Sequence, residues 1–382
     1  MTGIQSWITI NLALRKPKAH TMTRKQLLSA AIAATLAAPG AQALEFTADE
    51  GLSLAENTTF NLYGTVEPKV ISEKNEDGDA STELDDEDST LGFAFETRVS
   101  NAVTAFGQVE LEYSSDDNSD GFDSQDSAFL GVKGDFGKVQ AGNFDSVYED
   151  LIIDATEVAE DAEISDEAVA GEDNQIAYYS PDWNGFSFRT QARIQGRDEG
   201  PGSEDSNEVG LSIAGGYTGN NWGLYAGYDD RAADSTDEVY NANGEQLYVD
   251  NGGNITTNDD FDALTAYDSE NTYGVAGIYG IGQFEFGAKY SIQENADNAP
   301  AGDETTFTAL RGTFSQGRTE YYGAVQRVSP DDETNTVKER DEITLGVSHQ
   351  LYEPLSIWAE AGQYDRVEDE GDHVMVGAIF SF

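Results

Sequence analysis

The stretch "HVMVGAIFSF" (residues 373–382) ends the chain on alternating apolar residues. Residues at period two share one face of a β-strand, and here one face collects five apolar side chains: Val374, Val376, Ala378, Phe380 and Phe382. The last residues of soluble proteins usually form a frayed polar tail, because they gain little from burial. We therefore expect an apolar environment to cover this strand up to its final residue.

The composition excludes several classes of protein. The 382 residues carry 21 Lys and Arg against 72 Asp and Glu, a formal charge of −51, which argues against nucleic acid as a partner because phosphates would be repelled. There is no cysteine, so the fold is expected to hold without disulfides. No run of 18 or more apolar residues follows residue 43, which excludes a helical membrane span on the sequence.

Residues 1–43 contain no acid and end on a signal-peptide pattern. From Met22, "MTRKQLLSAAIAATLAAPGAQA" gives a basic start, an apolar stretch and an Ala-Gln-Ala end. An amphipathic helix is the alternative, but the Ala-x-Ala end favours a signal peptide. We predict that 1–43, including an upstream extension over 1–21, is removed, and that 44–382 forms a single domain.

After residue 57 the chain divides into sixteen short segments of alternating polarity. In "FEFGAKYSIQ" (residues 284–293), the apolar side chains of Phe284, Phe286 and Tyr290 point away from Glu285 and Lys289. A period of two predicts strands whose two faces meet different surroundings.

Short turns alternate strictly with long acidic loops along the chain. A closed up-and-down barrel with all its short turns at one rim gives this rhythm, whereas the Greek-key connections of a sandwich would scramble the loop lengths. The expected loops are 71–88, 114–125, 144–173, 197–206, 231–269, 294–303, 330–338 and 367–370.

The polarity of the faces favours a membrane barrel. A soluble barrel of this size would bury its apolar faces, whereas a membrane barrel turns them toward lipid and keeps a polar interior. Closure also pairs every backbone group, which lipid requires. The predicted fold is all-β: a transmembrane antiparallel up-and-down β-barrel of 16 strands, with short periplasmic turns and long extracellular loops. The last strand would then pair with the first, and Phe382 would lie at the lipid–water boundary.

The order and spacing of several phrases resemble one family over essentially the whole of 44–382. They are "FNLYGTVEPKV" (60–70), "LGFAFETRVSNAVTAFGQVELEY" (91–113), "FLGVKGDFGKVQAGNFDSVYED" (129–150), "NQIAYYSPDWNGFSFRTQA" (174–192) and "VGAIFSF" (376–382). The chain resembles a general (trimeric) porin of the Gram-negative outer membrane.

This resemblance implies a homotrimer among outer-membrane lipid and lipopolysaccharide, in which each subunit is a water-filled channel for small hydrophilic solutes and ions. It also implies that Phe380 and Phe382 form the signal for the outer-membrane assembly machinery. No cofactor is expected.

In this family the third long loop folds into the barrel and narrows the pore. Its counterpart is 144–173, with twelve acids and no base; an ordinary solvated acidic loop is the alternative. The candidate lining residues are Asp154, Glu157, Glu160, Asp161, Glu163, Asp166 and Glu167. Carboxylates in a pore concentrate cations, so we predict cation selectivity.

Family members usually place basic residues on the wall opposite that loop. The matching positions here are Thr65, Thr90, Asn143 and Gly171, and none is basic. Inward-facing bases occur elsewhere, and Arg189 and Arg193 are the best candidates for a replacement wall, with Arg98 also facing inward. The alternative is that these bases pair with inward acids such as Glu96, Glu110 or Glu285 and simply hold the wall.

Two other functions remain open. A substrate-specific sugar channel would need an aromatic track inside the pore, for which the inward candidates are Tyr63, Phe106, Phe129, Tyr225 and Trp358. A non-conducting acidic barrel could act as an adhesin or ion-binding coat.

Neither a catalytic site nor a metal site is expected. His349 and His373 are isolated at strand ends, and no cysteine is available as a nucleophile. "DDNSDGFDSQDS" (116–127) resembles a calcium loop but ends on Ser127 where such loops need Glu.

Overall fold

The computed structural model describes most of the chain after residue 56. The described ranges are 57–75, 78–116, 122–167, 169, 172–194, 209–230, 248–249, 255–256, 262–263, 271–294, 304–331, 339–365 and 371–382. The expected signal peptide, residues 1–43, lies outside them. No helix in these ranges has the length and apolar character needed to cross a membrane.

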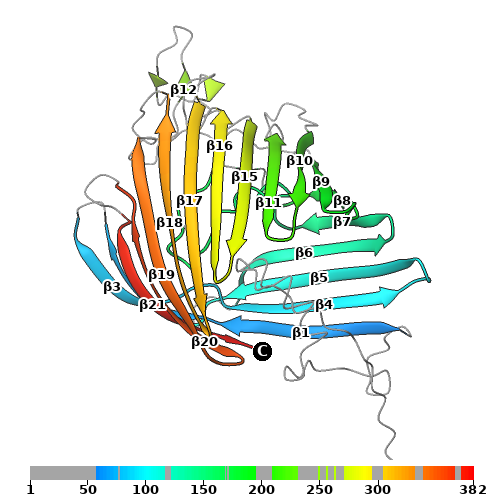
Figure 1. The fold of residues 1–382 in the computed structure, drawn as a ribbon, viewed down its shortest axis with the longest axis horizontal. Coiled ribbons are helices and arrows are strands. Elements are labelled where there is room, and N and C mark those ends of the chain that lie inside the picture. The colour runs from blue at the N-terminus through cyan, green and yellow to red at the C-terminus, as the bar shows by residue number, and fades with distance from the viewer. Residues whose placement is uncertain are drawn as a thin grey trace, which may run out of the picture.

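Eighteen strand segments build one sheet (Figure 1). They are β1 (Thr58–Val66), β2 (Pro68–Lys74), β3 (Ala80–Asp86), β4 (Thr90–Arg98), β5 (Val103–Tyr113), β6 (Phe122–Gly134), β7 (Gly137–Asn143), β8 (Gln175–Tyr179), β9 (Phe186–Ile194), β10 (Val209–Thr218), β11 (Trp222–Asp230), β15 (Asn271–Ile281), β16 (Phe284–Glu294), β17 (Glu304–Gln316), β18 (Thr319–Pro330), β19 (Arg340–Tyr352), β20 (Leu355–Gln363) and β21 (His373–Ser381).

The sheet closes on itself, as the ending of the chain predicts. Neighbouring strands are antiparallel, and β21 pairs with β20 on one side and with β1 and β2 on the other. Ser381 lies opposite Thr65, and the Phe382 N–H donates to the Gly64 carbonyl at 3.0 Å. The last residues therefore complete the ring.

A proline interrupts the first long strand. Pro68 has no N–H to donate, and the chain leaves the ladder at Glu67, between β1 and β2. The Ser89 side-chain oxygen accepts the Glu67 N–H at 2.9 Å, and the Glu87 N–H donates to the Glu67 carbonyl at 2.8 Å. Both partners lie between β3 and β4, so hydrogen bonds join the break between β1 and β2 to the neighbouring break between β3 and β4. Counting β1–β2 and β3–β4 as one strand each gives the sixteen strands expected.

The loop predicted over 71–88 is wrong. Residues 71–74 continue β2, and Ala80–Asp86 forms β3 against it in register from Pro68↔Asp86 to Lys74↔Ala80. The acidic composition suggested a loop. Val70 and Leu84 nevertheless lie opposite each other and both are exposed, so an apolar pair on the outer face supports a strand there.

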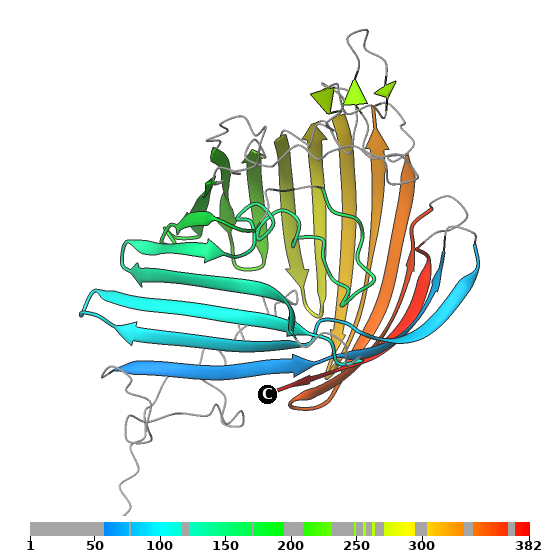
Figure 2. The same cartoon turned by 180° about the vertical axis from the view of Figure 1, so that it is seen from behind.

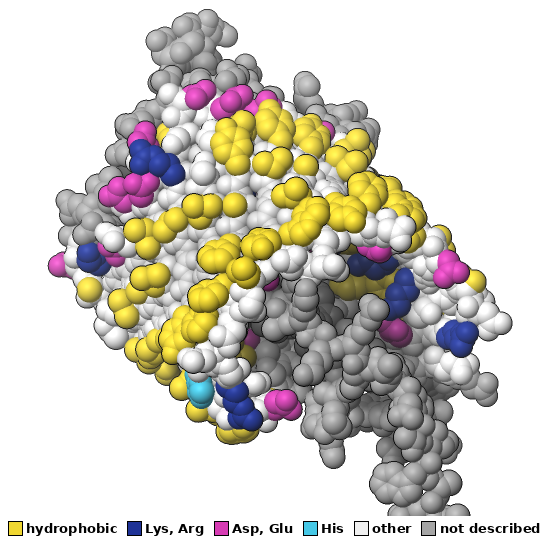
Figure 3. Space-filling view, viewed as in Figure 1, with side chains coloured by type: hydrophobic (Ala, Val, Ile, Leu, Met, Phe, Trp, Pro, Cys, Tyr) yellow, Lys and Arg dark blue, Asp and Glu magenta, His cyan; other side chains and the backbone are white. Residues whose placement is uncertain are grey.

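The faces of the strands have the polarity of a membrane barrel. In β16, Glu285, Lys289 and Ser291 are buried, whereas Phe286 and Tyr290 are about half exposed. Apolar side chains spread over the outer surface of the strands, and several acidic side chains lie along its upper edge (Figure 3). Near that edge, β12 (Tyr248–Val249), β13 (Ile255–Thr256) and β14 (Asp262–Ala263) form a small separate sheet within the loop expected over 231–269.

We predict that Leu310→Arg, in the middle of β17, destabilises the folded barrel by about 2–4 kcal/mol, because it places a charge on the lipid face. Leu310 is 56% exposed on the outer surface. Gln316→Arg, at the end of the same strand, should cost at most about 1 kcal/mol near the interface. Urea unfolding in lipid vesicles measures both, and equal losses would contradict this orientation.

Candidate functional site

The described part of the acidic loop, which spans residues 144–173 between β7 and β8, runs along the inside of the barrel (Figure 2). It starts with consecutive turns over 147–156, in which the Asp150 N–H donates to Ser146 and the Ile152 N–H to Tyr148. Its side chains contact the inner faces of strands from β2 round to β20. These contacts place the described part of the loop inside the barrel rather than in the solvent outside it.

The first half of the loop packs against a part of the wall that carries no side chains, at two glycines. Gly227 of β11 lies opposite Gly274 of β15, and the rings and branches of Tyr148 and Ile152 pack onto both. A Cβ added at Gly227 would lie 2.7 Å from the Tyr148 ring, and one at Gly274 would lie 2.6 Å from Ile152. Only a residue without a side chain leaves room for this approach.

Apolar side chains of the second half of the loop are also covered by the wall. Ala162 packs in a cluster with Trp358 and Met375, and Ile164 packs with Ala309 and Ala324. Each of these six side chains is at most 5% exposed. Trp358, a candidate for an open aromatic track, is therefore covered by the loop.

Two wall carboxylates hold the backbone of the loop. Glu360 of β20 accepts the N–H groups of Glu160, Asp161 and Ala162 at 2.6, 3.0 and 2.9 Å. Glu342 of β19 accepts the Ser165 N–H at 2.8 Å and its hydroxyl at 2.6 Å. Hydrogen bonds to an ionised acceptor are about twice as strong as neutral ones. An acidic wall thus binds an acidic loop through its main chain.

Three wall bases bind the loop as well. Lys289 contacts Glu167 at 2.7 Å and Asp166 at 3.4 Å. The Arg311 Nε–H donates to the Ala155 carbonyl at 2.6 Å, and Lys69 forms an ion pair with Asp161. Burial opposes ionisation of Asp161, but its hydrogen bonds with Glu87 and Lys69 hold its pKa below the usual value.

The seven predicted loop residues differ in their surroundings. Asp154 and Glu167 are buried, and Asp161 is paired with Lys69. The carboxylates of Glu157, Glu163 and Asp166 come together, with their oxygens within 4.8 Å of one another, and Asp166 is exposed. Glu160 is half-buried beside the Glu360 carboxylate.

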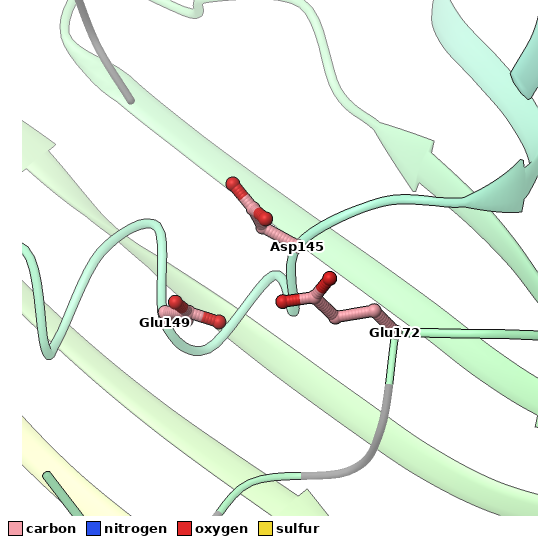
Figure 4. A group of neighbouring side chains, drawn as sticks. All are labelled: Asp145, Glu149 and Glu172. Atoms are coloured by element: carbon pink, nitrogen blue, oxygen red, sulfur yellow. The ribbon is translucent and has the colours of Figure 1, made fainter. Parts of the chain in front are cut away.

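A second acidic group lies at the base of the loop. Asp145 and Glu149 from its start meet Glu172 from its end, and the Glu172 carboxylate points toward the other two (Figure 4).

The predicted wall residues that the structure describes make local hydrogen bonds. Thr65 and Thr90 bond to each other at 3.0 Å, whereas Asn143 donates to the Gln125 carbonyl at 3.4 Å. Arg98 bonds to Ser100 and Asn101 of the adjacent short turn. The fourth matching position, Gly171, lies outside the described residues.

The two candidate arginines bind the loop itself. Arg189 pairs with Asp150, and Arg193 pairs with Asp173 at 2.7 Å. Their partners are therefore acids at the two ends of the loop. Of the inward acids named as alternatives, Glu96 pairs with Lys133 and Glu285 with Arg311.

Sequence reasoning missed the glycine patch and the carboxylates of Glu342 and Glu360. The signal for the two acids was available, because both stand on the polar side of strands whose other side is apolar, as in Glu342–Ile343–Thr344–Leu345. Their target, the backbone of an acidic loop, carries no signal in the sequence. Lys138 belongs to the inward-facing bases that the alternation predicts, but its contact with an aromatic ring was not foreseen: its ammonium lies 3.6 Å from the centre of the Tyr179 ring.

We predict that Gly274→Val displaces the first half of the acidic loop, because its side chain would overlap Tyr148 and Ile152. The chain has no cysteine, so Ala159→Cys gives a single position for a spin label on the loop. The label should become more mobile in the Gly274→Val background. Gly312→Val is the matched control, since a Cβ there has its nearest neighbour at an ordinary 3.6 Å. Identical spectra in the wild-type and Gly274→Val backgrounds would contradict the packing of the loop on Gly274.

Sequence comparisons agree with this architecture. A family model described as "Gram-negative porin" matches residues 29–370. The chain is 28% identical over 399 residues to a "Monosaccharide porin" of Halomonas sp and, equally, to a "Major outer membrane protein" of Halomonas elongata, covering 94% of this chain and 100% of each relative.

Solved structures share the fold. A Salmonella typhi OmpF complex with daunomycin aligns with a TM-score of 0.62 at 16% identity, over 89% of this chain and 100% of that one. An anion-selective porin from Comamonas acidovorans aligns with a TM-score of 0.59 at 16% identity, over 85% and 100%. With the matched family model and the closed sixteen-stranded barrel, the chain belongs to the Gram-negative porin family and is a protein of the outer membrane.

Proposed function

We propose that this porin forms a channel for passive diffusion of small hydrophilic solutes and ions, narrowed by the acidic loop and selective for cations. The observation that carries the proposal is the group of Glu157, Glu163 and Asp166, whose carboxylates gather on a loop inside the barrel. Carboxylates beside a narrow aqueous path raise the local cation concentration and repel anions.

The pairing of the surrounding bases also supports selectivity for cations. Lys69, Lys289, Arg189 and Arg193 each form an ion pair with an acid of the loop, so their charges are compensated where they stand. The fold does not fix the selectivity, since the structurally similar Comamonas porin is anion-selective. The sign must then come from the side chains that line the path, and here acids outnumber the bases near the loop.

A trimer belongs to the same proposal. One of the structural neighbours is described as a trimer form, a Vibrio cholerae outer membrane protein with a TM-score of 0.61 at 18% identity. The outer surface of the barrel is apolar and can meet either lipid or a second subunit. We propose three separate channels in each assembly.

Planar-bilayer recording tests the channel and its selectivity. Across a tenfold potassium chloride gradient with EDTA present, conductance should appear in groups of three steps, with a reversal potential that favours potassium. The preference should weaken near 1 M salt, where the screening length falls to about 3 Å. A reversal potential that favours chloride would overturn the proposed selectivity, and folded protein without conductance would overturn the channel.

We predict that the double variant Glu163→Gln/Asp166→Asn lowers the potassium-to-chloride permeability ratio roughly threefold in dilute salt, as expected for removing charges a few ångströms from the ion path. Glu83→Gln, on the exposed face of β3, removes a charge outside the loop and should leave the ratio unchanged. Equal effects of the two variants would assign the selectivity to the overall charge of the protein.

A sugar-specific channel is the second candidate, favoured by the relative named a monosaccharide porin. Two of the aromatic residues expected to form a track, Phe106 and Trp358, are only 9% and 4% exposed, which favours general diffusion. Concentration-dependent block of the potassium current by monosaccharides would support the sugar channel, and block by none of them would exclude it.

A further inference from the structure

Two lysines stand opposite each other on the inner face of the barrel. Lys133 on β6 and Lys138 on β7 are direct cross-strand partners, and Lys138 shares its face of the strand with the buried Gln140. Each lysine is one residue from the end of its strand at the β6–β7 turn, which lies on the same side of the barrel as the β4–β5 turn (Figure 1). Like charges directly opposite each other destabilise a sheet. A negative charge beside the pair would remove this cost.

Aromatic rings hold the ammonium groups in place. Lys138 Nζ lies 3.6 Å from the centre of the Tyr179 ring. The Phe106 ring is shared, because its centre lies 5.4 Å from Lys133 Nζ and 6.0 Å from Lys138 Nζ. Arg189 is the cross-strand partner of Tyr179, and its guanidinium lies 5.4 Å from the centre of that ring. Cations within about 6 Å of a ring centre are attracted to its face. Three cations are thus gathered around two rings.

Neighbouring acids compensate two of these three cations. Lys133 forms an ion pair with Glu96, and Arg189 forms one with Asp150 of the acidic loop. Lys138 forms no ion pair within the described ranges of the chain, where its contacts are with the two rings. The charges that act on Lys138 come from one acid, Asp150, and from the two other bases. Its own positive charge therefore remains uncompensated.

Both existing ion pairs are accessible to water. The side chains of Lys133 and Glu96 are 42% and 35% exposed, and those of Arg189 and Asp150 are 28% and 27% exposed. Ion pairs exposed to this extent contribute little to stability. A ligand with more negative charge than one carboxylate can therefore replace these acids at small cost.

We propose that Lys138, Lys133 and Arg189 bind the phosphate group of a small solute inside the pore, at the rim that carries the short turns. A phosphate monoester carries close to two negative charges at neutral pH and three strong acceptor oxygens, whereas a lysine side chain offers donors alone. A carboxylate has one charge and two oxygens, which does not match two opposed ammonium groups. The lysines face the lumen, so the phosphate comes from a solute rather than from a lipid headgroup.

The phosphate site and the proposed cation selectivity concern different parts of the pore. The selectivity is assigned to a group of loop carboxylates, of which Asp166 contacts Lys289 on β16. The lysine pair stands on β6 and β7, next to the turn that joins them. A solute that enters from this rim reaches the lysines at the start of its path.

Isothermal calorimetry with sodium pyrophosphate tests the site on the detergent-folded protein. Divalent cations are first removed with EDTA, and the EDTA is dialysed away, because divalent cations would join pyrophosphate to the many acids. In about 0.1 M sodium chloride, where the screening length is about 10 Å, the wild type should show one saturable site per chain. Lys138→Gln should weaken binding at least about tenfold, as expected for the loss of one charge-assisted hydrogen bond, and Lys138→Arg should retain most of it.

Arg318→Gln is the matched control. Arg318 is an exposed base in the short β17–β18 turn, where it donates to the Leu351 carbonyl at 2.9 Å, so its removal takes the same charge from the same rim. This variant should bind pyrophosphate like the wild type. Absence of a saturable site, wild-type binding by Lys138→Gln, or equal loss in Lys138→Gln and Arg318→Gln would each overturn the proposal.

Thermal unfolding provides a second measurement on the same variants. A ligand bound only by the folded state raises the unfolding temperature as its concentration rises. Pyrophosphate should therefore raise the unfolding temperature of the wild type and of Arg318→Gln, and raise that of Lys138→Gln much less. Each protein is compared with itself without pyrophosphate, so a change in basal stability does not affect the result. Equal increases in all three proteins would contradict the site.

The effect of the ligand on ion flow rests on the proposed function. In planar bilayers, pyrophosphate should reduce the potassium current at a lower concentration from one side than from the other, because the lysines lie at one rim. Equal block from both sides would contradict this position. Binding heats do not require conduction. A protein that binds pyrophosphate without conducting would contradict only the channel, whereas one that conducts without binding it would contradict only the phosphate site.

Discussion

Closure of the backbone ladder is the constraint on which the rest of this molecule depends. Lipid offers no hydrogen-bond partners, so each strand must be paired on both sides within the membrane. The pairing of β21 with β1 and β2 meets this condition, and it extends to Phe382, whose N–H binds Gly64. Once the ring is closed, the alternation along each strand assigns apolar side chains to the lipid and polar ones to the interior.

A polar interior makes it possible to place an acidic loop there. The loop is held by its main chain, which donates to Glu342 and Glu360, and by apolar residues packed on a wall of small side chains. The bases Lys69, Lys289 and Arg311 then compensate part of the remaining charge. The acids around Glu157, together with Asp166, which also contacts Lys289, are those that we propose act on passing ions.

The predictions from sequence succeed where a periodic pattern reports the environment. Alternating polarity, the rhythm of turns and loops and the aromatic ending predict a closed sixteen-stranded barrel of the porin family, and this is confirmed. The pattern fails over 71–88, where a run of acids resembles a loop but extends the first hairpin. An acidic composition indicates exposure to water. A strand that extends beyond the membrane is exposed to water just as a loop is, so composition does not distinguish the two.

The partners within the barrel could not be predicted, because they join residues far apart in the chain. Glu360 and Ala162 are 198 positions apart, and Arg311 and Ala155 are 156 apart. Nothing in the sequence indicates that wall acids bind loop amides, or that Gly227 and Gly274 leave room for Tyr148. The sequence by itself determined the class of fold, the orientation of its faces and the negative sign of its charge, because these depend on local periodicity and composition. Tertiary structure alone decided which acids are neutralised and which stay free, because pairing of charges depends on distances that only the closed barrel creates.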